Sequence, residues 1–302
     1  MASYPLSGKV VFVTGAGRGI GFETARQMHA RGASVAVVDI DGQMAMESAA
    51  QIGERAIGID ADVRDREQIE NAVAATVERF GGIDVAVANA GIAPKRATTA
   101  RTVAVEDWER IIDVNLLGVW RTARAALPQI VERRGQLVLV ASVYAFFNGV
   151  MNSAYATAKA GVEALGRSLR AELAVHGASA TVAYFGFIDT KMVQDAFTDP
   201  LSHRLEGRLP TFMSRRLGPH AAGAAIVRGV EKRAPRVIAP RWWAVGSVLR
   251  GALNPLLDRR MEGDDELLSI LREVEDRAAI EPERREPTQV RVSSSSRKTS
   301  DS

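Results

Sequence analysis

One glycine-rich turn restricts the fold of this chain more than any other feature. It follows a short β-branched run, Lys9–Thr14, and leads into a helical pattern that continues through Arg31. The turn reads Thr14-Gly-Ala-Gly-Arg-Gly-Ile-Gly21. Glycines let the backbone approach a pyrophosphate closely, and a helix N-terminus supplies free N–H groups and the positive end of a dipole. The stretch therefore predicts a dinucleotide-phosphate site between a strand and a helix.

The next apolar run, Ala33–Asp39, ends in an acid. An acid at this place accepts hydrogen bonds from the adenosine ribose hydroxyls and repels a 2′-phosphate, so Asp39 favours NAD over NADP. Arg18 is a counter-signal, because a guanidinium in the glycine turn can pair with a 2′-phosphate. Its alternative is an exposed arginine at the helix start, and we give Asp39 the greater weight.

The alternation of apolar strands and helical patterns continues along the chain. We expect strands at 55–60, 83–91, 135–142, 178–185 and 236–240, and helices at about 42–52, 65–80, 105–133, 153–176 and 218–233. This order predicts an α/β Rossmann fold in a single domain, a doubly wound seven-stranded parallel sheet with helices on both faces. Ligands of such sheets bind beyond the carboxyl ends of the strands. The residues that fall there are Asp39, Asp62, Asn89, Ser142 and Gly186.

Tyr155 and Lys159 form a candidate acid–base pair. They are four residues apart, which places them on one face of a helix. A nearby cation favours phenolate, so we expect Lys159 to lower the pKa of Tyr155 below its ordinary value of about 10. Ser142, at the end of a neighbouring strand, can hold a carbonyl or alcohol oxygen against the phenol. The alternative is an ordinary helix pair without a catalytic role.

Taken together, these motifs resemble the short-chain dehydrogenase/reductase family over about residues 5–240. The resemblance implies four catalytic residues, Asn115, Ser142, Tyr155 and Lys159. It implies cofactor contacts at Gly15, Arg18, Gly19, Ile20, Gly21, Asp39, Ile40, Asp62, Val63, Asn89, Ala90, Gly91, Tyr155, Lys159, Gly186, Ile188 and Thr190. Two positions depart from the family pattern: Ala88 stands where asparagine is usual, and Phe185 stands where a proline normally precedes the glycine.

The resemblance also implies a mechanism, the transfer of a hydride between a secondary alcohol or ketone and NAD(H). Tyr155 would be the general acid/base, and Lys159 would lower its pKa and bind the nicotinamide ribose. Ser142 would position the substrate oxygen, and Asn115 would hold a water that relays protons to Lys159. Asp62 would contact the adenine, although a lone Asp there is also a common helix N-cap.

Family members commonly pair the helices at about 105–133 and 153–176, which implies a homodimer or homotetramer. A catalytically silent NAD sensor or a membrane-surface binding protein on the same fold is the alternative to an enzyme, because a fold does not by itself give a function.

The region after the sixth strand is expected to select the substrate. Residues 191–216 should form a lid, unless their apolar side chains only pack it onto the body. These side chains are Met192, Phe197, Leu201, Leu205, Phe212 and Met213. With Phe146, Phe147 and Phe187 they favour a bulky hydrophobic alcohol or ketone, of steroid-, terpenoid- or lipid-like chemistry.

Beyond the catalytic domain, residues 1–240, we expect a helical extension at 241–280 that packs on the same domain. Residues 281–302 are rich in Pro, Ser, Arg and Glu and should be disordered. Within the extension, residues 241–257 combine two tryptophans with flanking arginines. Such a segment suits a peripheral membrane contact, a cover over the substrate pocket or a subunit contact.

Composition excludes several other classes of protein. The chain has no cysteine, and its four histidines lack metal-ligand spacing, so we expect neither thiolate chemistry nor a metal. A net charge of +3, without a basic stripe interleaved with aromatic residues, argues against a nucleic-acid partner. We find no signal-peptide pattern and no apolar run of the roughly 18 residues that a membrane span needs. We therefore expect a cytoplasmic protein.

Overall fold

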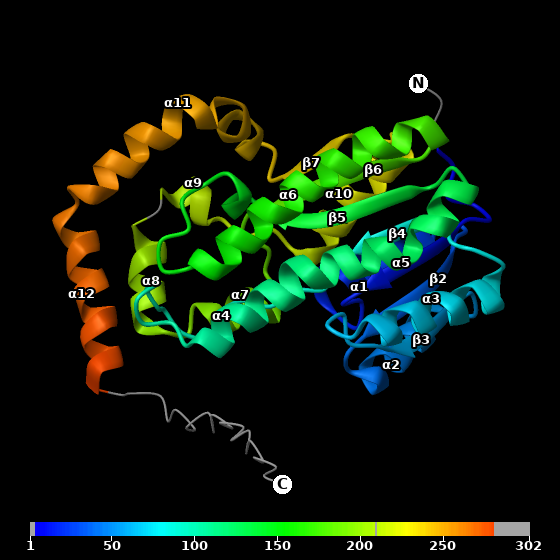
Figure 1. The fold of residues 1–302 in the computed structure, drawn as a ribbon, viewed down its shortest axis with the longest axis horizontal. Helices are drawn as coiled ribbons and strands as arrows, with labels where there is room; N and C mark the ends of the chain where they lie inside the picture. The colour runs from blue at the N-terminus through cyan, green and yellow to red at the C-terminus, as the bar shows by residue number, and fades with distance from the viewer. Residues whose placement is uncertain (1–3, 209, 281–302) are drawn as a thin grey trace, which may run out of the picture.

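The structure is a computed structural model that describes residues 4–208 and 210–280, apart from the side chain of Phe212 (Figure 1). The prediction of a disordered tail at 281–302 and the pocket role of Phe212 lie outside the described residues. Seven parallel strands form one sheet in the order β3-β2-β1-β4-β5-β6-β7. They are β1 (Val10–Thr14), β2 (Ser34–Asp39), β3 (Ala56–Asp60), β4 (Val85–Ala88), β5 (Gln136–Ser142), β6 (Ser179–Phe185) and β7 (Arg236–Ala239). The predicted doubly wound parallel sheet is confirmed.

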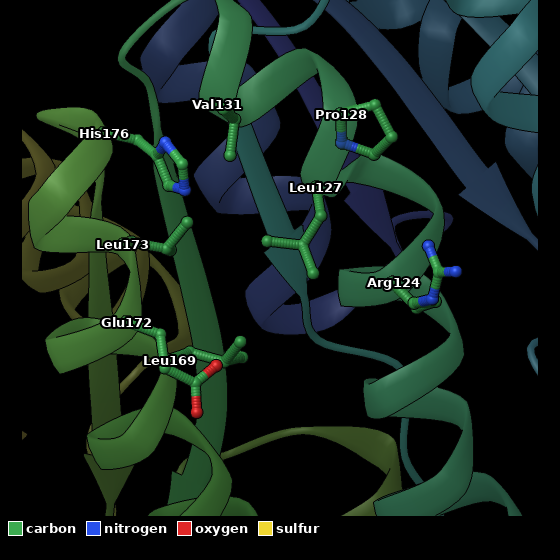
Figure 2. A pocket seen from close by; sticks show the side chains of 8 residues that line it. All are labelled: Arg124, Leu127, Pro128, Val131, Leu169, Glu172, Leu173 and His176. Atoms are coloured by element: carbon green, nitrogen blue, oxygen red, sulfur yellow. The ribbon is translucent and has the colours of Figure 1, made fainter.

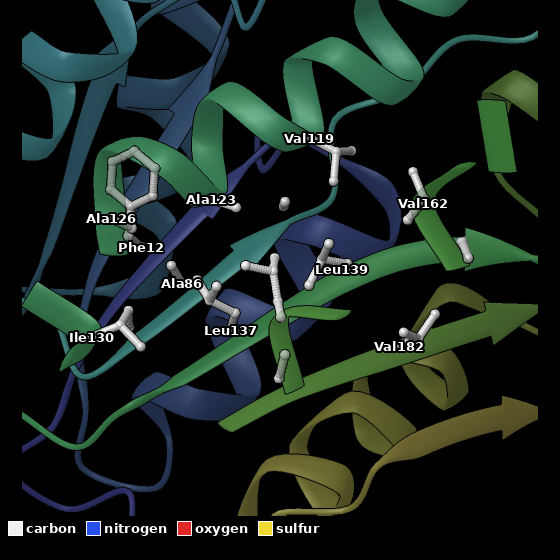
Figure 3. Packing of buried hydrophobic residues seen from close by; sticks show 14 of the residues in the cluster. Phe12, Ala86, Val119, Ala123, Ala126, Ile130, Leu137, Leu139, Val162 and Val182 are labelled. Carbon is white, nitrogen blue, oxygen red and sulfur yellow. The ribbon is translucent and has the colours of Figure 1, made fainter. Parts of the chain in front are cut away.

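Helices cover both faces of the sheet. One face carries α1 (Gly19–His29), α2 (Gly42–Ile52) and α10 (Pro219–Glu231), and the other carries α3 (Arg66–Phe80), α5 (Gly118–Glu132) and α6 (Ser153–Leu173). Because side chains alternate along a strand, Phe12 packs toward the second group while its neighbours Val11 and Val13 pack toward the first. Figure 3 shows the second core, in which apolar side chains of α5 and α6 meet those of the central strands.

The helix expected over 105–133 is interrupted. It consists of α4 (Val105–Ile112), a π-helical turn over Asp113–Leu117, and α5. Such turns occur mostly as single insertions and are frequent at functional sites. Asn115 lies in the middle of this turn and is fully buried.

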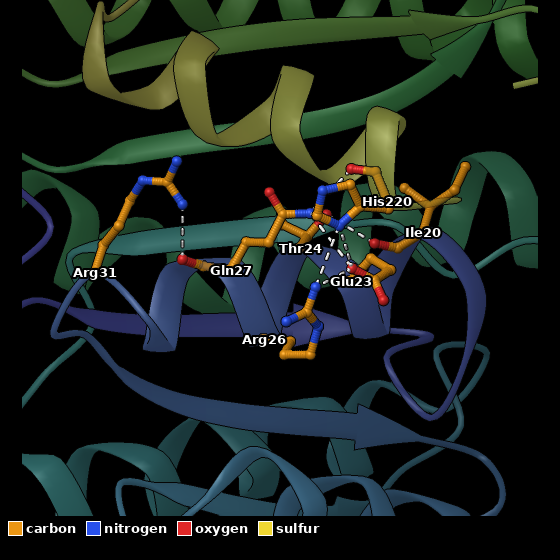
Figure 4. A network of polar contacts seen from close by, with 7 residues as sticks. All are labelled: Ile20, Glu23, Thr24, Arg26, Gln27, Arg31 and His220. Carbon is orange, nitrogen blue, oxygen red and sulfur yellow. Dashed lines mark hydrogen bonds and ion pairs between the residues drawn. The ribbon is translucent and has the colours of Figure 1, made fainter. Parts of the chain in front are cut away.

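Polar contacts fasten α10 to α1 directly behind the glycine turn (Figure 4). The side-chain amide of Gln27 donates to the carbonyl of His220 at 2.9 Å, and the His220 ring lies 3.2 Å from the Glu23 carboxylate. The two helices approach so closely that a Cβ at Gly223 would lie 2.9 Å from the backbone of Glu23. The first turn of α1 is thus held from behind by α10.

A buried carboxylate joins β1 and β4 at the amino ends of the strands. Asp84 is 1% exposed and accepts hydrogen bonds from the Val10 backbone N–H at 3.0 Å and from Lys9 at 2.9 Å. Arg133, which follows α5, adds a third contact at 3.2 Å. This cluster lies at the amino ends of the strands, whereas the glycine turn lies at the carboxyl ends.

The segment after β6 contains α7 (Lys191–Ala196), α8 (Pro200–Gly207) and α9 (Thr211–Ser214), and β7 is followed by α11 (Trp243–Glu262) and α12 (Asp265–Ile280). Helix α12 runs beside α8 (Figure 1). Ion pairs join them, Arg204 to Glu273 at 2.5 Å and Arg277 to Asp199 at 2.8 Å, and Arg208 contacts the start of α12. The extension therefore holds α8 in place through charged contacts.

Candidate active site

The glycine turn has the close backbone packing that a phosphate cradle requires. Gly15 has a positive φ of 61°, and a Cβ there would lie 2.7 Å from the Cα of Ala90. A Cβ at Gly21 would lie 2.4 Å from the carbonyl oxygen of Gly15. Arg18 immediately precedes α1, and its exposed side chain makes no capping bond to the first turn. The first N–H groups of α1, beginning at Gly19 and Ile20, therefore have no side-chain cap.

Asn89 and Asp39 hold this turn from two sides. The Asn89 amide donates to the carbonyl oxygens of Thr14 at 3.0 Å and Gly15 at 2.9 Å. The Asp39 carboxylate accepts from the Gly17 backbone N–H at 2.9 Å and remains partly exposed at the end of β2. Ile40, beside it, is 62% exposed. Asp39 thus borders the turn where the ribose contact was predicted.

The environment of Asp62 differs from one of our two expectations. The N-cap of α3 is Asp65, which accepts from the backbone N–H groups of Glu67 and Gln68, so the N-cap interpretation of Asp62 is wrong. Asp62 instead accepts from the Arg64 side chain at 2.8 Å. Val63 is buried, and it packs so closely on Gly118 that a Cβ there would lie 2.7 Å from its methyl group. The adenine contact of these residues stays a prediction.

Three of the four candidate catalytic residues meet at the carboxyl end of β5. Tyr155 and Lys159 lie on α6, and Ser142 is the last residue of β5. The Ser142 hydroxyl donates to the Phe185 carbonyl at 3.2 Å and also shares a hydrogen bond with Tyr155. The Tyr155 ring packs edge-to-face on Tyr144 with 5.9 Å between the ring centroids. The Ser142 hydroxyl and the Tyr155 phenol are therefore hydrogen-bonded to each other at the carboxyl end of β5.

Lys159 lies beneath this pair. It is 3% exposed, its Nζ donates to the Val140 carbonyl at 2.9 Å, and the same atom lies 5.5 Å from the Tyr155 ring centroid. The loop after β4 passes beside it, since a Cβ at Gly91 would lie 3.7 Å from Nζ and 2.9 Å from the Asn115 Oδ1. A glycine at position 91 is thus required by its close approach to Asn115, and it lies at ordinary contact distance from Lys159.

Asn115 uses its whole amide on that loop. Its Oδ1 accepts from the Ile92 backbone N–H and its Nδ2 donates to the Ile92 carbonyl, both at 2.8 Å. The π-helical turn presents the side chain at this point, and the two bonds fix the loop beside Lys159. This positioning is what the structure shows for Asn115, and its role in a proton relay stays a prediction.

The electrostatics of the pair reverse one expectation. Burial raises the pKa of Tyr155 to about 12, although its hydrogen bond with Ser142 acts in the opposite direction. Burial also lowers the pKa of Lys159 to about 8. The expected lowering of the Tyr155 pKa is therefore wrong for this arrangement, because the loss of hydration of the phenolate outweighs the hydrogen bond with Ser142. The Lys159 Nζ is directed at the Val140 carbonyl instead.

The loop after β6 closes the other side of the site. Ile188 is buried, and the Thr190 methyl group would lie 3.4 Å from a Cβ at Gly19, so this loop meets the glycine turn. Gly186 is close to Trp243, because a Cβ there would lie 2.6 Å from the indole Nε1. Trp243 was not among our site residues. Its proximity to Gly186 depends on a contact across the chain that no local motif signals.

A narrow apolar pocket opens beside Tyr144. Its cavity volume is about 60 Å³, below the roughly 300–1,000 Å³ of ligand pockets, so the lid must move to admit a large molecule. Its walls come from the loop after β5, the lid and α11. The lining residues are Val143, Tyr144, Phe147, Asn148, Val150, Phe187, Phe197, Leu205, Glu206, Trp243 and Met261.

The predicted aromatic and lid residues divide into two groups. Phe147, Phe187, Phe197 and Leu205 line the pocket, as expected for a substrate wall. Phe146 does not, because it is buried in the core against Tyr184 and Trp243. The remaining described lid side chains lie outside the pocket lining: Leu201 packs against the α12 cluster, Met213 packs on the main core and Met192 is exposed.

A second and larger hollow lies away from the candidate catalytic residues. Figure 2 shows side chains of α5 and α6 facing each other across it. Its volume is about 340 Å³, and it includes Arg124, Leu127, Leu169 and His176. It lies at the carboxyl end of α6, whereas Tyr155 lies near the amino end. It therefore adds nothing to the chemistry at Ser142.

Residues 9–201 match the family model described as short chain dehydrogenase. The chain belongs to the short-chain dehydrogenase/reductase family. Among the curated relatives of this dehydrogenase/reductase is the short-chain reductase protein NovJ of Streptomyces niveus, 38% identical over 218 residues, covering 71% of this chain and 80% of that protein. Another is (-)-trans-carveol dehydrogenase of Rhodococcus erythropolis, 34% identical over 210 residues, covering 64% and 76%.

Solved structures agree with this assignment. A 3-ketoacyl-(acyl-carrier-protein) reductase of Brucella melitensis, complexed with NADH, matches with a TM-score of 0.69 and 27% identity, over 78% of this chain and 97% of that one. A short-chain dehydrogenase/reductase of Mycobacterium marinum matches equally well, with a TM-score of 0.69 and 29% identity over 77% and 94%. The sheet and the site of this short-chain dehydrogenase/reductase thus belong to a known oxidoreductase architecture.

Proposed function

We propose that this short-chain dehydrogenase/reductase transfers a hydride between NAD(H) and a secondary alcohol or ketone. The observation that carries the proposal is the convergence of Ser142, Tyr155 and Lys159 beside the glycine turn. The residues present fit a dinucleotide, since Gly15 and Gly21 leave no room for a side chain where the backbone must approach a pyrophosphate. A silent NAD sensor would need no such group of three, which favours an enzyme.

Each of the three side chains has a role that its surroundings support. Ser142, already hydrogen-bonded to the phenol, holds the substrate oxygen. Tyr155 takes the proton from an alcohol at its hydroxyl oxygen, or gives it to a ketone. Lys159, whose Nζ lies 5.5 Å from the Tyr155 ring centroid, would bind the nicotinamide ribose. A bound NAD supplies the hydride acceptor. Lys159 and Thr190 would contact its nicotinamide half, and Asp39 its adenosine half.

NAD rather than NADP is the proposed cofactor, and substitution of Asp39 tests this preference. We expect Asp39→Asn to lower the ratio of kcat/KM for NAD to that for NADP by about 10–100-fold, because a hydrogen bond to a charged group is worth roughly 1.5–3 kcal/mol. The amide oxygen can still accept from Gly17, so the turn is kept. Steady-state rates with both cofactors give the ratio.

The matched control for this prediction is Asp41→Asn, which keeps a side-chain acceptor for Met44 at the start of α2. It should leave the ratio unchanged. A wild-type enzyme that prefers NADP, or an Asp39→Asn enzyme with the wild-type ratio, would contradict the proposal.

A bulky hydrophobic alcohol or ketone is the proposed substrate. The aromatic walls formed by Phe147, Phe187, Phe197 and Trp243 support this class, as does the carveol dehydrogenase among the relatives. We expect kcat/KM for a cyclic terpenoid alcohol to exceed that for a small polyol by at least about 100-fold, since each buried methylene is worth roughly 1–3 kcal/mol of discrimination. A panel of alcohols, monitored by absorbance of the reduced nicotinamide, measures this. A preference for polyols would refute it.

We also propose how the chain is assembled and located. Residues 241–280 extend the domain of residues 1–240, which the contacts of α12 with α8 support. A homodimer or homotetramer is the proposed assembly, and the open hollow between α5 and α6, the helices whose pairing the family resemblance implies, supports it. The proposed location is the cytoplasm, with a peripheral membrane contact through residues 241–257.

A further inference from the structure

Helix α11 covers the substrate pocket with one of its faces. On this inner side Trp243 is 4% exposed and packs on Phe147 with 5.6 Å between the ring centroids. The Asn254 amide donates to the Phe146 carbonyl at 3.1 Å, and Arg250 pairs with Glu163 at 2.8 Å. Met261 lines the pocket at the far end of the helix. This inner face alone accounts for the attachment of α11 to the body.

The outer face of α11 is also apolar, and it is open to solvent. Its exposed side chains recur at intervals of three and four residues, which places them in one stripe along the helix. They are Val245, Val248, Leu249, Leu253 and Leu256, with 62%, 64%, 47%, 37% and 67% of their surface exposed. Single exposed apolar residues are ordinary, but a contiguous apolar surface of this kind marks an interaction site.

Arginines lie at both ends of this stripe. Arg241 precedes it, and Arg259 and Arg260 follow it. Arg241 lies in the turn just before α11, and Arg259 and Arg260 lie in its last turn; all three side chains are exposed. No acidic residue occurs between Arg241 and Asp258, and Asp258 accepts from the Asn148 amide at 2.8 Å. The outer face therefore presents an apolar centre with a cation at each end.

We propose that the outer face of α11 docks onto an anionic lipid surface, with the helix lying in the plane of the interface. Phosphate headgroups would pair with the terminal arginines while the stripe enters the acyl boundary. A second copy fits less well, because a two-fold pair places the same surface on both partners and brings arginines against arginines. Of the helices that the structure describes, none is both long and apolar enough to cross a membrane.

This docking would place the pocket against the lipid. Trp243 and Met261 line the pocket from the inner face of the helix whose outer face meets the membrane. An apolar substrate dissolved in the bilayer could then enter without crossing water. This last step rests on the proposed hydride transfer, whereas the docking itself does not; it specifies the face and the partner of the membrane contact proposed for residues 241–257.

Co-sedimentation with vesicles tests the docking without any measurement of turnover. We expect the full chain to pellet with vesicles of phosphatidylcholine and phosphatidylglycerol, and to pellet more weakly with vesicles of phosphatidylcholine alone. Binding to the anionic vesicles should weaken as the salt concentration is raised. Val248→Glu with Leu256→Glu should reduce partitioning by at least about 10-fold. Arg259→Gln with Arg260→Gln should reduce it by about 10-fold on anionic vesicles only.

The control is Val175→Glu, which introduces the same type of substitution, with one negative charge instead of two, at a side chain that is 82% exposed on another part of the molecule. It should partition like the wild type. Absence of wild-type binding to anionic vesicles, or an equal loss in Val175→Glu, would overturn the proposal. Sedimentation velocity detects the competing occupant: a drop in oligomeric state in Val248→Glu with Leu256→Glu, without vesicle binding by the wild type, assigns the face to a second copy. Vesicle binding by a chain that oxidises no alcohol would keep the docking and reject the proposed function.

Discussion

Tyr155→Phe should lower kcat by at least about 10²–10⁴-fold, the usual contribution of general acid–base catalysis. The substitution removes one hydroxyl and its hydrogen bond with Ser142. The ring stays, and so does its edge-to-face packing on Tyr144. Affinity for NAD and the melting temperature should therefore remain near the wild-type values. Steady-state rates, a cofactor titration and thermal unfolding measure the three quantities.

Tyr184→Phe is the matched control for this substitution. Burial raises the pKa of Tyr184 to about 12, as it does for Tyr155, so ionisation is disfavoured at both phenols. Tyr184 packs on Phe146 in the core and has neither Ser142 nor Lys159 as a described partner. Its variant should keep its turnover. Retained turnover in Tyr155→Phe would remove the basis of the proposed mechanism.

Asp84→Ala should destabilise the protein by about 3 kcal/mol without a matching loss of turnover at temperatures where it stays folded. The change leaves the buried Val10 N–H without its acceptor and removes the partner of Lys9 and Arg133. Because this cluster lies at the amino ends of the strands, the residues around Ser142 are not disturbed. Urea unfolding gives the stability, and kcat at 20 °C to 25 °C gives the control.

The pH dependence of this loss has a definite sign. Burial alone would raise the pKa of Asp84, but the hydrogen bonds from Lys9, Val10 and Arg133 outweigh it and hold the pKa below its ordinary value. A lowered folded-state pKa stabilises above the unfolded-state pKa of about 3.9 and loses this contribution as the pH falls through the folded-state pKa. The stability difference between wild type and Asp84→Ala should thus be full at pH 7 and shrink below about pH 4. A difference that grows on acidification would contradict this assignment. Asp84→Asn, which keeps an acceptor for Val10, should lose less.

The elements of the sheet could be predicted because their signals are local. β-Branched runs, the glycine turn and the acid that ends β2 each specify a conformation from neighbouring residues, and parallel strands bring their carboxyl ends together. The meeting of Ser142, Tyr155 and Lys159 follows from that topology. Their positions on β5 and α6 needed no information from the rest of the chain.

What could not be predicted depends on contacts between distant segments. The π-helical turn at Asn115 accompanies hydrogen bonds to Ile92, which a helical pattern over 105–133 does not signal. The pKa of Tyr155 depends on how deeply the phenol is buried, and the four-residue spacing between Tyr155 and Lys159 does not predict this burial. Phe146 and Phe147 are adjacent, yet only Phe147 lines the pocket, because the turn after β5 directs Phe146 into the core.

The positions of Trp243 and Met261 in the sequence have a consequence for how the protein can evolve. Both follow β7, so part of the pocket wall is encoded in one continuous stretch of the gene, downstream of every residue proposed to carry out the redox step. Mutation or recombination within that stretch can change which molecule is accepted without altering Ser142, Tyr155 or the glycine turn. New substrate preferences can thus arise on an unchanged catalytic sheet.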